Sequence, residues 1–285
     1  MKRTVLILMT VIFFHNIATA QKPQGYSLDK GMKIEVLSSV NQVITQTVEG
    51  QRYETIQDIV TSDQFEVVEV LDNGYKIKMT GMYRTLTMEG PGQEMEMDSR
   101  KEGDSNLAFK ALTGKSFHFE MDGKGKLLSF EGLSDYYDAI KLELAGTPLE
   151  GSIETIIESI SEEALKSGLD GQFYIYPNSN EATWDRTTST VANNLPVIVS
   201  SEFTWDSDNS ILAAGEMSLE GSTTVQGMAM STTMKGTQNT IFDLDSSTGL
   251  STLIQIQQGL KGQMEMQGMT IPMELITTTK VTFKW

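Results

Sequence analysis

Long stretches in which apolar and polar residues alternate lie on both sides of a shorter helical region. Before that region the alternation runs from Met32 through Phe65 to Leu71, where Asp72-Asn73-Gly74 is a strong hairpin signal. After it, four long alternating segments fill residues 211–285. Strands of about 15 residues would span roughly 50 Å, far above the usual length. The pattern therefore predicts long antiparallel meanders that must curve or bend.

The apolar positions of one predicted strand change phase at Gly81. Ile77 and Met79 share one face, whereas Met82 and Leu86 carry the apolar face in the opposite phase. An extra residue in one strand of an antiparallel pair produces such a switch, and glycine favours that geometry. The sequence therefore predicts a β-bulge at Gly81.

The clearest helical segment is Ser152 to Leu169. Its apolar residues follow the i, i+3, i+4, i+7 spacing of one helical face, and its acidic residues fall elsewhere. Ser152 is a favourable N-cap, and Gly168 is a residue type that ends helices. The apolar stripe consists of Ile153, Ile156, Ile157 and Ile160. We expect one helix whose stripe packs on a β-sheet as part of the core.

A second amphipathic helix precedes this one. Ser134 is its expected N-cap, and Tyr136, Ile140 and Leu144 fall on one face. Gly146-Thr147-Pro148 separates the two helices because glycine and proline both interrupt helical structure.

Together these patterns predict a mainly β (α+β) fold. Long curved antiparallel β-meanders form an open barrel or half-barrel that packs on the two central amphipathic helices. Two β halves, about 31–131 and 172–285, are joined by a helical segment at about 133–169. We expect a single β-rich domain at 21–285, in which Trp285 closes the core of the last strand.

The first 20 residues have the pattern of a secretory signal peptide. Lys2 and Arg3 precede an apolar run from Val5 to Phe14, and Ala18-Thr19-Ala20 matches a signal-peptidase site. The run is shorter than the roughly 18 apolar residues of a transmembrane helix. We therefore expect export to the periplasm or the extracellular space, with no integral membrane segment after cleavage.

The chain is acidic and contains no cysteine. Its net charge is −16, and the loss of Lys2 and Arg3 with the signal peptide would make it −18. Such a charge repels nucleic acid and anionic membranes. Without cysteine, neither disulfides nor lipid attachment at a cysteine is available, so stability depends on the core.

Residues for catalysis are scarce. His118 would have to serve any Ser-His-Asp arrangement, yet it lies between Phe117 and Phe119 on the polar side of a strand. Paired carboxylates for glycoside hydrolysis remain an alternative, but 38 acidic residues make some close pair almost inevitable. We therefore assign no catalytic residue and no cofactor.

Methionine is abundant, with 17 in the chain. Thioether sulfur suits Cu(I), and three Met-x-Met pairs could contribute ligands from adjacent strands. These pairs are Met95 with Met97, Met228 with Met230, and Met264 with Met266. The alternative, which we favour, is that methionines at a period of two fill gaps in a core.

An aromatic cluster opens the second β half. It consists of Phe173, Tyr174, Tyr176 and Trp184, with Arg186 close by. Tyrosine and tryptophan combine apolar rings with polar groups, so the cluster suits the border of a ligand pocket. It equally suits a packed corner between the two halves, which is the interpretation we favour.

Several short segments, in their order along the chain, resemble the exported bacterial family catalogued as domain of unknown function 6263. These segments are Gly31 to Gln51, Leu112 to Phe119, Gly125 to Gly132, Tyr176-Pro177 ahead of Trp184, Asp243 to Gly249, and Gly268 to Pro272. The resemblance covers nearly all of the chain after the signal peptide. It implies export and a β-rich fold, and it implies no reaction.

These observations favour a non-catalytic binding module for an apolar or lipid-like ligand or for an envelope partner. A ligand between sheet and helix follows from analogy with exported half-barrel lipid carriers. The alternatives are an outer-membrane β-barrel, whose strands alternate in the same way, and an exported hydrolase that uses paired carboxylates. The oligomeric state is left open.

We predict that the mature protein begins at Gln21, because the charged start, the apolar run and the Ala-Thr-Ala end agree. N-terminal sequencing of protein isolated from its own host measures this directly. Mature protein that retains residues 1–20 in the cytoplasm would contradict the prediction.

Overall fold

A computed structural model describes residues 22–179, 181–192, 195–225, 228–266 and 268–285. The predicted signal peptide lies outside these residues, as does Gln267 of the turn before the last strand. The strands are β1 Lys33–Val48, β2 Gln51–Leu71, β3 Gly74–Gly90, β4 Gln93–Asp98, β5 Ser116–Asp122, β6 Leu127–Glu131, β7 Thr183–Ala192, β8 Leu195–Ser207, β9 Ser210–Val225, β10 Met228–Leu244, β11 Ser251–Met266 and β12 Met269–Lys284. The helices are η1 Asp104–Asn106, α1 Leu107–Ala111, α2 Leu133–Leu144, η2 Glu150–Ser152, α3 Ile153–Ser159 and α4 Glu162–Phe173.

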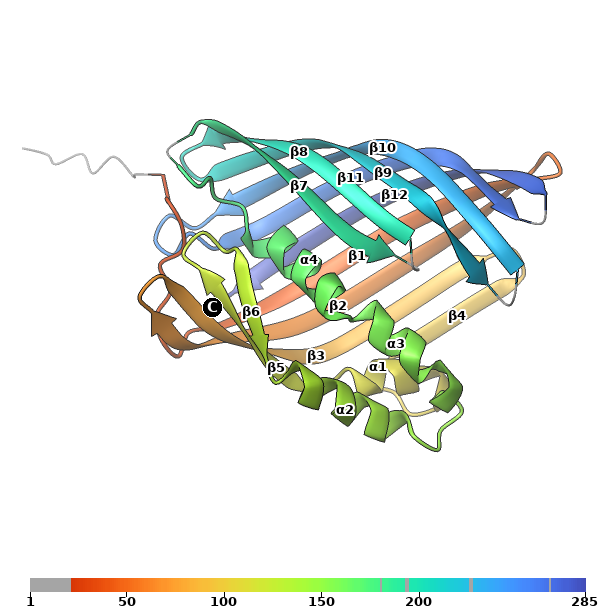
Figure 1. Cartoon of the computed structure of the whole chain (residues 1–285), viewed down its shortest axis with the longest axis horizontal. Helices are drawn as coiled ribbons and strands as arrows, with labels where there is room; N and C mark the ends of the chain where they lie inside the picture. The colour runs from red at the N-terminus through yellow and green to blue at the C-terminus, as the bar shows by residue number, and fades with distance from the viewer. Residues whose placement is uncertain (1–21, 180, 193–194, 226–227, 267) are drawn as a thin grey trace, which may run out of the picture.

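The strands form a 12-stranded antiparallel sheet in the order β6-β5-β3-β2-β1-β12-β11-β10-β9-β8-β7, with β4 paired to β3. The first and last strands join the two predicted halves, because β1 pairs with β12 from Glu35 opposite Lys284 to Gln46 opposite Met273. The sheet is strongly curved (Figure 1) but does not close within the described residues, where β6 and β7 form its two edges. The predicted mainly β half-barrel is confirmed.

The main core lies between the concave face of this sheet and the helices. Alternation places Ile34, Val36, Phe65 and Val67 on that face, and all four are buried. Ile34 is directly opposite Phe65 in the β1–β2 pair, so buried side chains form rows across the strands. The period of two therefore positions the core as the sequence predicts.

Helix α4 lies between the two sheet edges (Figure 1). Its Asp170 accepts a hydrogen bond from the backbone N–H of Leu127, on edge strand β6, at 2.9 Å. Its Leu169 and Phe173 are buried in the main core. The helix thus covers the gap that the open sheet leaves.

Helix α2 packs through the predicted face. Tyr136, Ile140 and Leu144 are all buried, and the Tyr136 ring lies edge-on to Phe117 with centroids 5.2 Å apart. The helix begins at Leu133 with Gly132 as its N-cap, two positions before the predicted cap Ser134.

The single helix predicted over Ser152 to Leu169 is wrong, because the chain forms two helices there. Ile160 leaves the helical conformation at φ −119° and ψ 27°. Ser161 then begins α4 as an N-cap that accepts a hydrogen bond from the Ala164 N–H at 3.4 Å. Gly168 does not end this helix, since burial of Phe173 carries it further.

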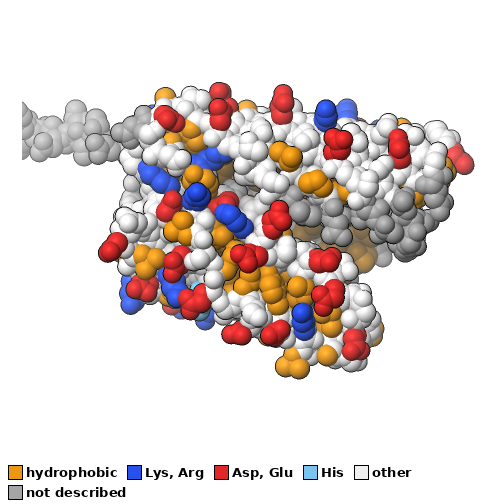
Figure 2. Space-filling view, viewed as in Figure 1, with side chains coloured by type: hydrophobic (Ala, Val, Ile, Leu, Met, Phe, Trp, Pro, Cys, Tyr) orange, Lys and Arg blue, Asp and Glu red, His pale blue; other side chains and the backbone are white. Residues whose placement is uncertain are grey.

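The isoleucine stripe contacts the core as predicted but is only half-buried. Its four members, Ile153, Ile156, Ile157 and Ile160, pack against the main core from its margin. Figure 2 shows hydrophobic side chains gathered over α2 and α3 on this face, with acidic side chains around them.

The predicted bulge is present, with Met82 as its extra residue. Gly81 is opposite Asp63 and Tyr83 is opposite Ser62, so Met82 has no partner in β2. A Cβ atom on Gly81 would lie 2.6 Å from the Leu112 carbonyl oxygen, which explains the glycine.

The prediction for Trp285 is wrong. Its side chain is 45% exposed rather than buried. The β12 strand ends at Lys284, whose partner Glu35 is the last in the β1–β12 pair, so no residue of β1 is opposite Trp285. Phe283 fills the core position at this end instead.

The segment after residue 21 closes one end of the half-barrel. The Tyr26 hydroxyl donates to the Phe173 carbonyl oxygen at 2.6 Å, and the Tyr75 hydroxyl donates to the Tyr26 carbonyl oxygen at 2.8 Å. Gly125 has φ 88°, and a Cβ atom there would collide with the Phe173 carbonyl. This end is therefore filled by aromatic rings and backbone.

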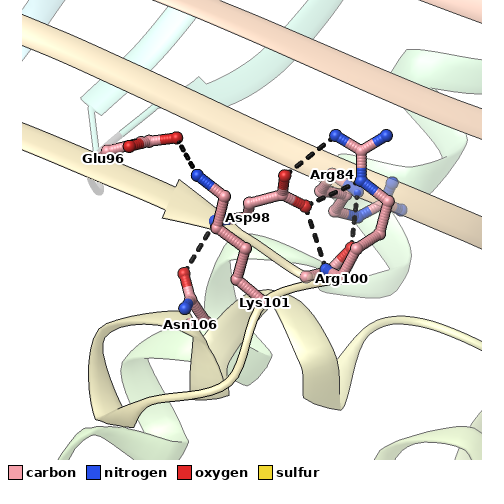
Figure 3. A network of polar contacts seen from close by, with 7 residues as sticks. Arg84, Glu96, Asp98, Arg100, Lys101 and Asn106 are labelled. Carbon is pink, nitrogen blue, oxygen red and sulfur yellow. Dashed lines mark hydrogen bonds and ion pairs between the residues drawn. The ribbon is translucent and has the colours of Figure 1, made fainter.

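A polar network fixes the end of β4 against the α1 segment (Figure 3). The Asp98 carboxylate accepts from Arg100 Nε at 2.9 Å and from Arg100 Nη2 at 2.8 Å, while the Asp98 N–H donates to Asn106 Oδ1 at 2.7 Å. The hydrogen bonds that the Arg100 side chain and then the Arg100 backbone N–H donate to this carboxylate lower the pKa of Asp98 to about 2. Lys101 and Glu96 form an ion pair beside it.

Ile140→Ala should destabilise the protein by about 2–5 kcal/mol, because Ile140 is fully buried and its truncation leaves a cavity. Leu142→Ala is the matched control on the same helix, since Leu142 is 80% exposed, and it should change stability by less than about 0.5 kcal/mol. Urea unfolding measures both. Equal effects of the two substitutions would contradict the packing of α2.

Asp98→Asn should lower stability at neutral pH and have no effect in strong acid. The folded pKa is about 2 and the ordinary value is 3.8, so the contribution of the carboxylate is complete above the ordinary value and is lost as the pH falls through the folded one. Urea unfolding at about pH 7 and about pH 2 tests this sign. A difference between the proteins that does not change with pH would contradict it.

Candidate functional site

A cavity lies between α4 and the concave face of the sheet. Its volume is about 330 Å³. The α4 segment contributes Ser167, Gly168, Asp170, Gly171, Gln172 and Tyr174 to its wall. The strands contribute mainly apolar side chains, among them Val199, Phe203, Met217, Phe242, Ile254 and Val281. The cavity is thus polar on the helix side and largely apolar on the sheet side.

A line of polar residues crosses the concave face at the level of this cavity. Each of these residues is paired across neighbouring strands with the next one in the line, except that Gly215 of β9 lies between Ser201 of β8 and Gln238 of β10. This polar row consists of Arg186, Ser201, Gln238, Gln258, Thr277, Gln42 and Gln57. Gln258 Nε2 donates to Gln238 Oε1 at 2.7 Å, and Gln42 Nε2 donates to Thr277 Oγ1 at 3.3 Å. Gln42, Gln238 and Gln258 therefore have partners within the row, whereas Gln57 Nε2 donates to Met88 Sδ on β3 at 3.6 Å.

Beyond the polar row lies a second apolar cluster, separate from the main core. Its buried members are Val197, Met217, Met234 and Leu260, and Val199, Leu219, Met273 and Leu275 pack against them. Leu260 follows Gln258 by two residues on β11, and therefore lies on the same face one step further along the strand. We call these residues the distal apolar cluster.

Arg186 is the end of the polar row on edge strand β7. Its guanidinium carbon lies 3.3 Å from the centroid of the Tyr174 ring and 5.8 Å from that of Phe203. Its Nη2 donates to the Tyr176 carbonyl oxygen, whereas its Nε and Nη1 are buried without a hydrogen-bond partner. Burial lowers the pKa of Arg186 from its ordinary value.

An opening of about 490 Å³ lies between α4 and β7 next to this cavity. Its wall shares Ser167, Asp170, Tyr174, Arg186 and Thr188 with the cavity. Lys166 pairs with Asp170 at 2.7 Å on its helix side. The gap between helix and edge strand therefore leads to the interior.

The predicted aromatic cluster divides into two parts. Three members are buried in the core, namely Phe173, Tyr176 and Trp184. The Tyr26 ring contacts both Phe173 and Tyr176, and the Trp205 ring contacts both Tyr176 and Trp184, as expected of a packed corner. Tyr174 and Arg186 instead line the cavity. The role of Tyr174 and Arg186 in binding a ligand stays a prediction.

The predicted methionine pairs lie in different parts of the sheet. Met230 is directly opposite Met266, and Met264 is opposite Thr232, in the β10–β11 pair. Met228 begins β10, opposite Val225. Met95 and Met97 lie on β4, which pairs with β3, so β3, β2, β1 and β12 separate them from β11 in the sheet order.

His118 lies on β5 between buried Phe117 and Phe119, with its own side chain half-buried on the other face. Among the residues that the structure describes, no group of three or more His, Asp or Glu side chains could hold a metal ion. In the same part of the chain, no helix is both long and apolar enough to cross a membrane.

Sequence reasoning missed the polar row as a unit. Gln238 and Gln258 interrupt otherwise apolar faces of β10 and β11, which is a visible signal. Their alignment with Arg186 depends on the register of strands that are distant in sequence. That register could not be read from the sequence.

These features define an open antiparallel half-barrel whose interior cavity is covered by a helix. The chain belongs to the Family of unknown function (DUF6263), whose family model matches residues 72–251. No curated protein matches the chain in sequence.

Solved structures resemble the fold at low sequence identity. A structure of lipovitellin, described as showing lipid–protein interactions, is 9% identical with a TM-score of 0.53. The match covers 91% of this chain and 26% of that one, so this chain spans about a quarter of the lipovitellin chain. An outer membrane channel from Pseudomonas putida F1 is 9% identical, with 91% and 97% of the chains covered and a TM-score of 0.38. Only the first similarity is strong enough to support the shared half-barrel fold.

Proposed function

We propose that this protein is an exported, non-catalytic binding protein that holds an apolar or lipid-like ligand on the concave face of its sheet. The observation that carries this proposal is the distal apolar cluster, which continues from the cavity under α4 without belonging to the main core. The partly buried members of the cluster, Val199, Leu219, Met273 and Leu275, still expose apolar surface. A ligand that removes this surface from water gains about 25 cal/mol per Å² of apolar area.

The size of the cavity agrees with a small-molecule ligand. Its volume of about 330 Å³ falls within the range of about 300–1,000 Å³ that is typical of ligand sites. The half-barrel of lipovitellin, whose structure is described by its lipid–protein interactions, supports the same kind of ligand by analogy of fold. The opening between α4 and β7 supplies a route of entry.

The alternatives have less support. A membrane-spanning barrel needs every backbone group of its strands paired, whereas β6 and β7 are sheet edges in the described residues. Glycoside hydrolysis needs two carboxyl groups across one site, but Asp170 is the single carboxylate of the described cavity wall and already accepts hydrogen bonds from Leu127 and Lys166.

Val199→Glu should abolish or weaken ligand binding by at least about tenfold, because it places a carboxylate in the apolar wall of the cavity. Ile198→Glu is the matched control, since Ile198 is 43% exposed on the opposite face of the same strand, and it should leave binding unchanged. Titration with the neutral fluorescent probe N-phenyl-1-naphthylamine measures both, and thermal unfolding by circular dichroism checks that each variant is folded.

The proposal fails if the wild-type protein gives no saturable signal with this neutral probe. It also fails if Val199→Glu and Ile198→Glu weaken the signal equally, because binding would then not depend on the concave face. If an envelope protein still binds the Val199→Glu variant, whose cavity is blocked, the apolar-ligand proposal would be replaced by the alternative that this protein binds an envelope partner.

A further inference from the structure

We infer that the ligand is a single-chain amphiphile with an anionic head group, a carboxylate or a phosphate, that binds at Arg186 while its tail lies along the distal apolar cluster. This inference rests on the proposed function and specifies its ligand class. Arg186 and the cluster lie on the same concave face, at neighbouring levels of the strands.

The charge balance of the cavity is the first argument. Of the described residues that line it, Arg186 is the one cation and Asp170 the one anion. Asp170 is already engaged by Lys166 at 2.7 Å and by the Leu127 N–H at 2.9 Å. In the described part of the chain, no carboxylate lies within 4.0 Å of the Arg186 guanidinium. When Lys166, which pairs with Asp170 from the neighbouring opening, is counted with Arg186 and Asp170, these three groups carry a net charge of +1, although the whole chain is strongly acidic.

The second argument is the hydrogen-bonding capacity that the protein leaves unused. Arg186 Nε and Nη1 have no partner, and Gln172 Oε1, at the end of α4 and on the same cavity wall, has none either. A buried donor without a partner lowers stability, and it does so more strongly when it is charged. Carboxylate and phosphate groups match the geometry of guanidinium N–H donors. A small movement of the Arg186 side chain off Tyr174 would present these donors to a head group in the cavity.

The third argument is direction. On one side of Arg186 the interior is filled, because Trp184 and Phe203 stack with ring centroids 5.6 Å apart. On the other side the next level is Val199 opposite Met217, at the start of the distal apolar cluster. If the head group binds at Arg186, the apolar tail therefore has one direction in which to extend. It runs parallel to the strands, away from the end that Trp184 and Phe203 fill and toward the distal apolar cluster.

The experiment compares ligands that differ in the head group alone. Dodecanoate, dodecyl phosphate and 1-dodecanol compete with N-phenyl-1-naphthylamine for wild-type protein, Arg186→Met and Lys280→Met. The wild type should bind each anionic ligand at least about tenfold more tightly than the alcohol, as expected for a charge-assisted pair. Arg186→Met should lose this preference and keep its affinity for the alcohol within about twofold. Lys280→Met removes an exposed cation of β12 that lines neither the cavity nor the opening, so this variant should keep the preference.

The outcomes separate this inference from the proposed function. Equal binding of acid and alcohol by the wild type would overturn the head-group assignment and leave the apolar site in place. Failure of all three ligands and of the probe to bind would overturn both. Acetate that competes as well as dodecanoate would show an anion site without a tail site, and would also overturn the inference. If thermal unfolding shows that Arg186→Met does not fold, Arg186→Lys replaces it, and this variant should retain at least part of the preference for the anion.

Discussion

The position of α4 between two unpaired sheet edges is the constraint on which the rest of the molecule depends. An open edge presents backbone N–H and C=O groups that need partners or cover. The Asp170 side chain supplies one such partner to Leu127 on β6, and Tyr174, just after the helix, contacts Arg186 on β7. One helix thus connects both edges, and burial of its Leu169 and Phe173 fixes it on the main core.

The cavity follows from this arrangement. A closed barrel of few strands is filled by its own side chains, whereas a half-barrel covered by a helix can leave space at the junction. Here the junction is polar on the helix side and apolar on the sheet side. Tyr26 and Tyr75 close one end of the half-barrel, so the interior is filled at that end.

Properties that depend on local sequence could be predicted. The period of two placed Ile34 and Phe65 in the core, and the phase change at Gly81 identified the bulge at Met82. The break between α3 and α4 was harder to predict, because Ser152 and Ser161 are both possible N-caps within one continuous amphipathic pattern. Properties that depend on pairing between distant strands could not be predicted, since exposure of Trp285 and alignment of Arg186 with Gln238 both follow from cross-strand register.

Polar residues inside a sheet can serve fold specificity instead of ligand binding, and the polar row contains examples of both. Gln238 and Gln258 hydrogen-bond to each other at 2.7 Å, so their pairing fixes the register of β10 and β11 without any further partner. A register role does not explain Arg186, because a buried cation without a carboxylate partner lowers stability and its remaining donors are unused. Gln238 and Gln258 are therefore accounted for by the sheet itself, whereas Nε and Nη1 of Arg186 have no partner among the described residues.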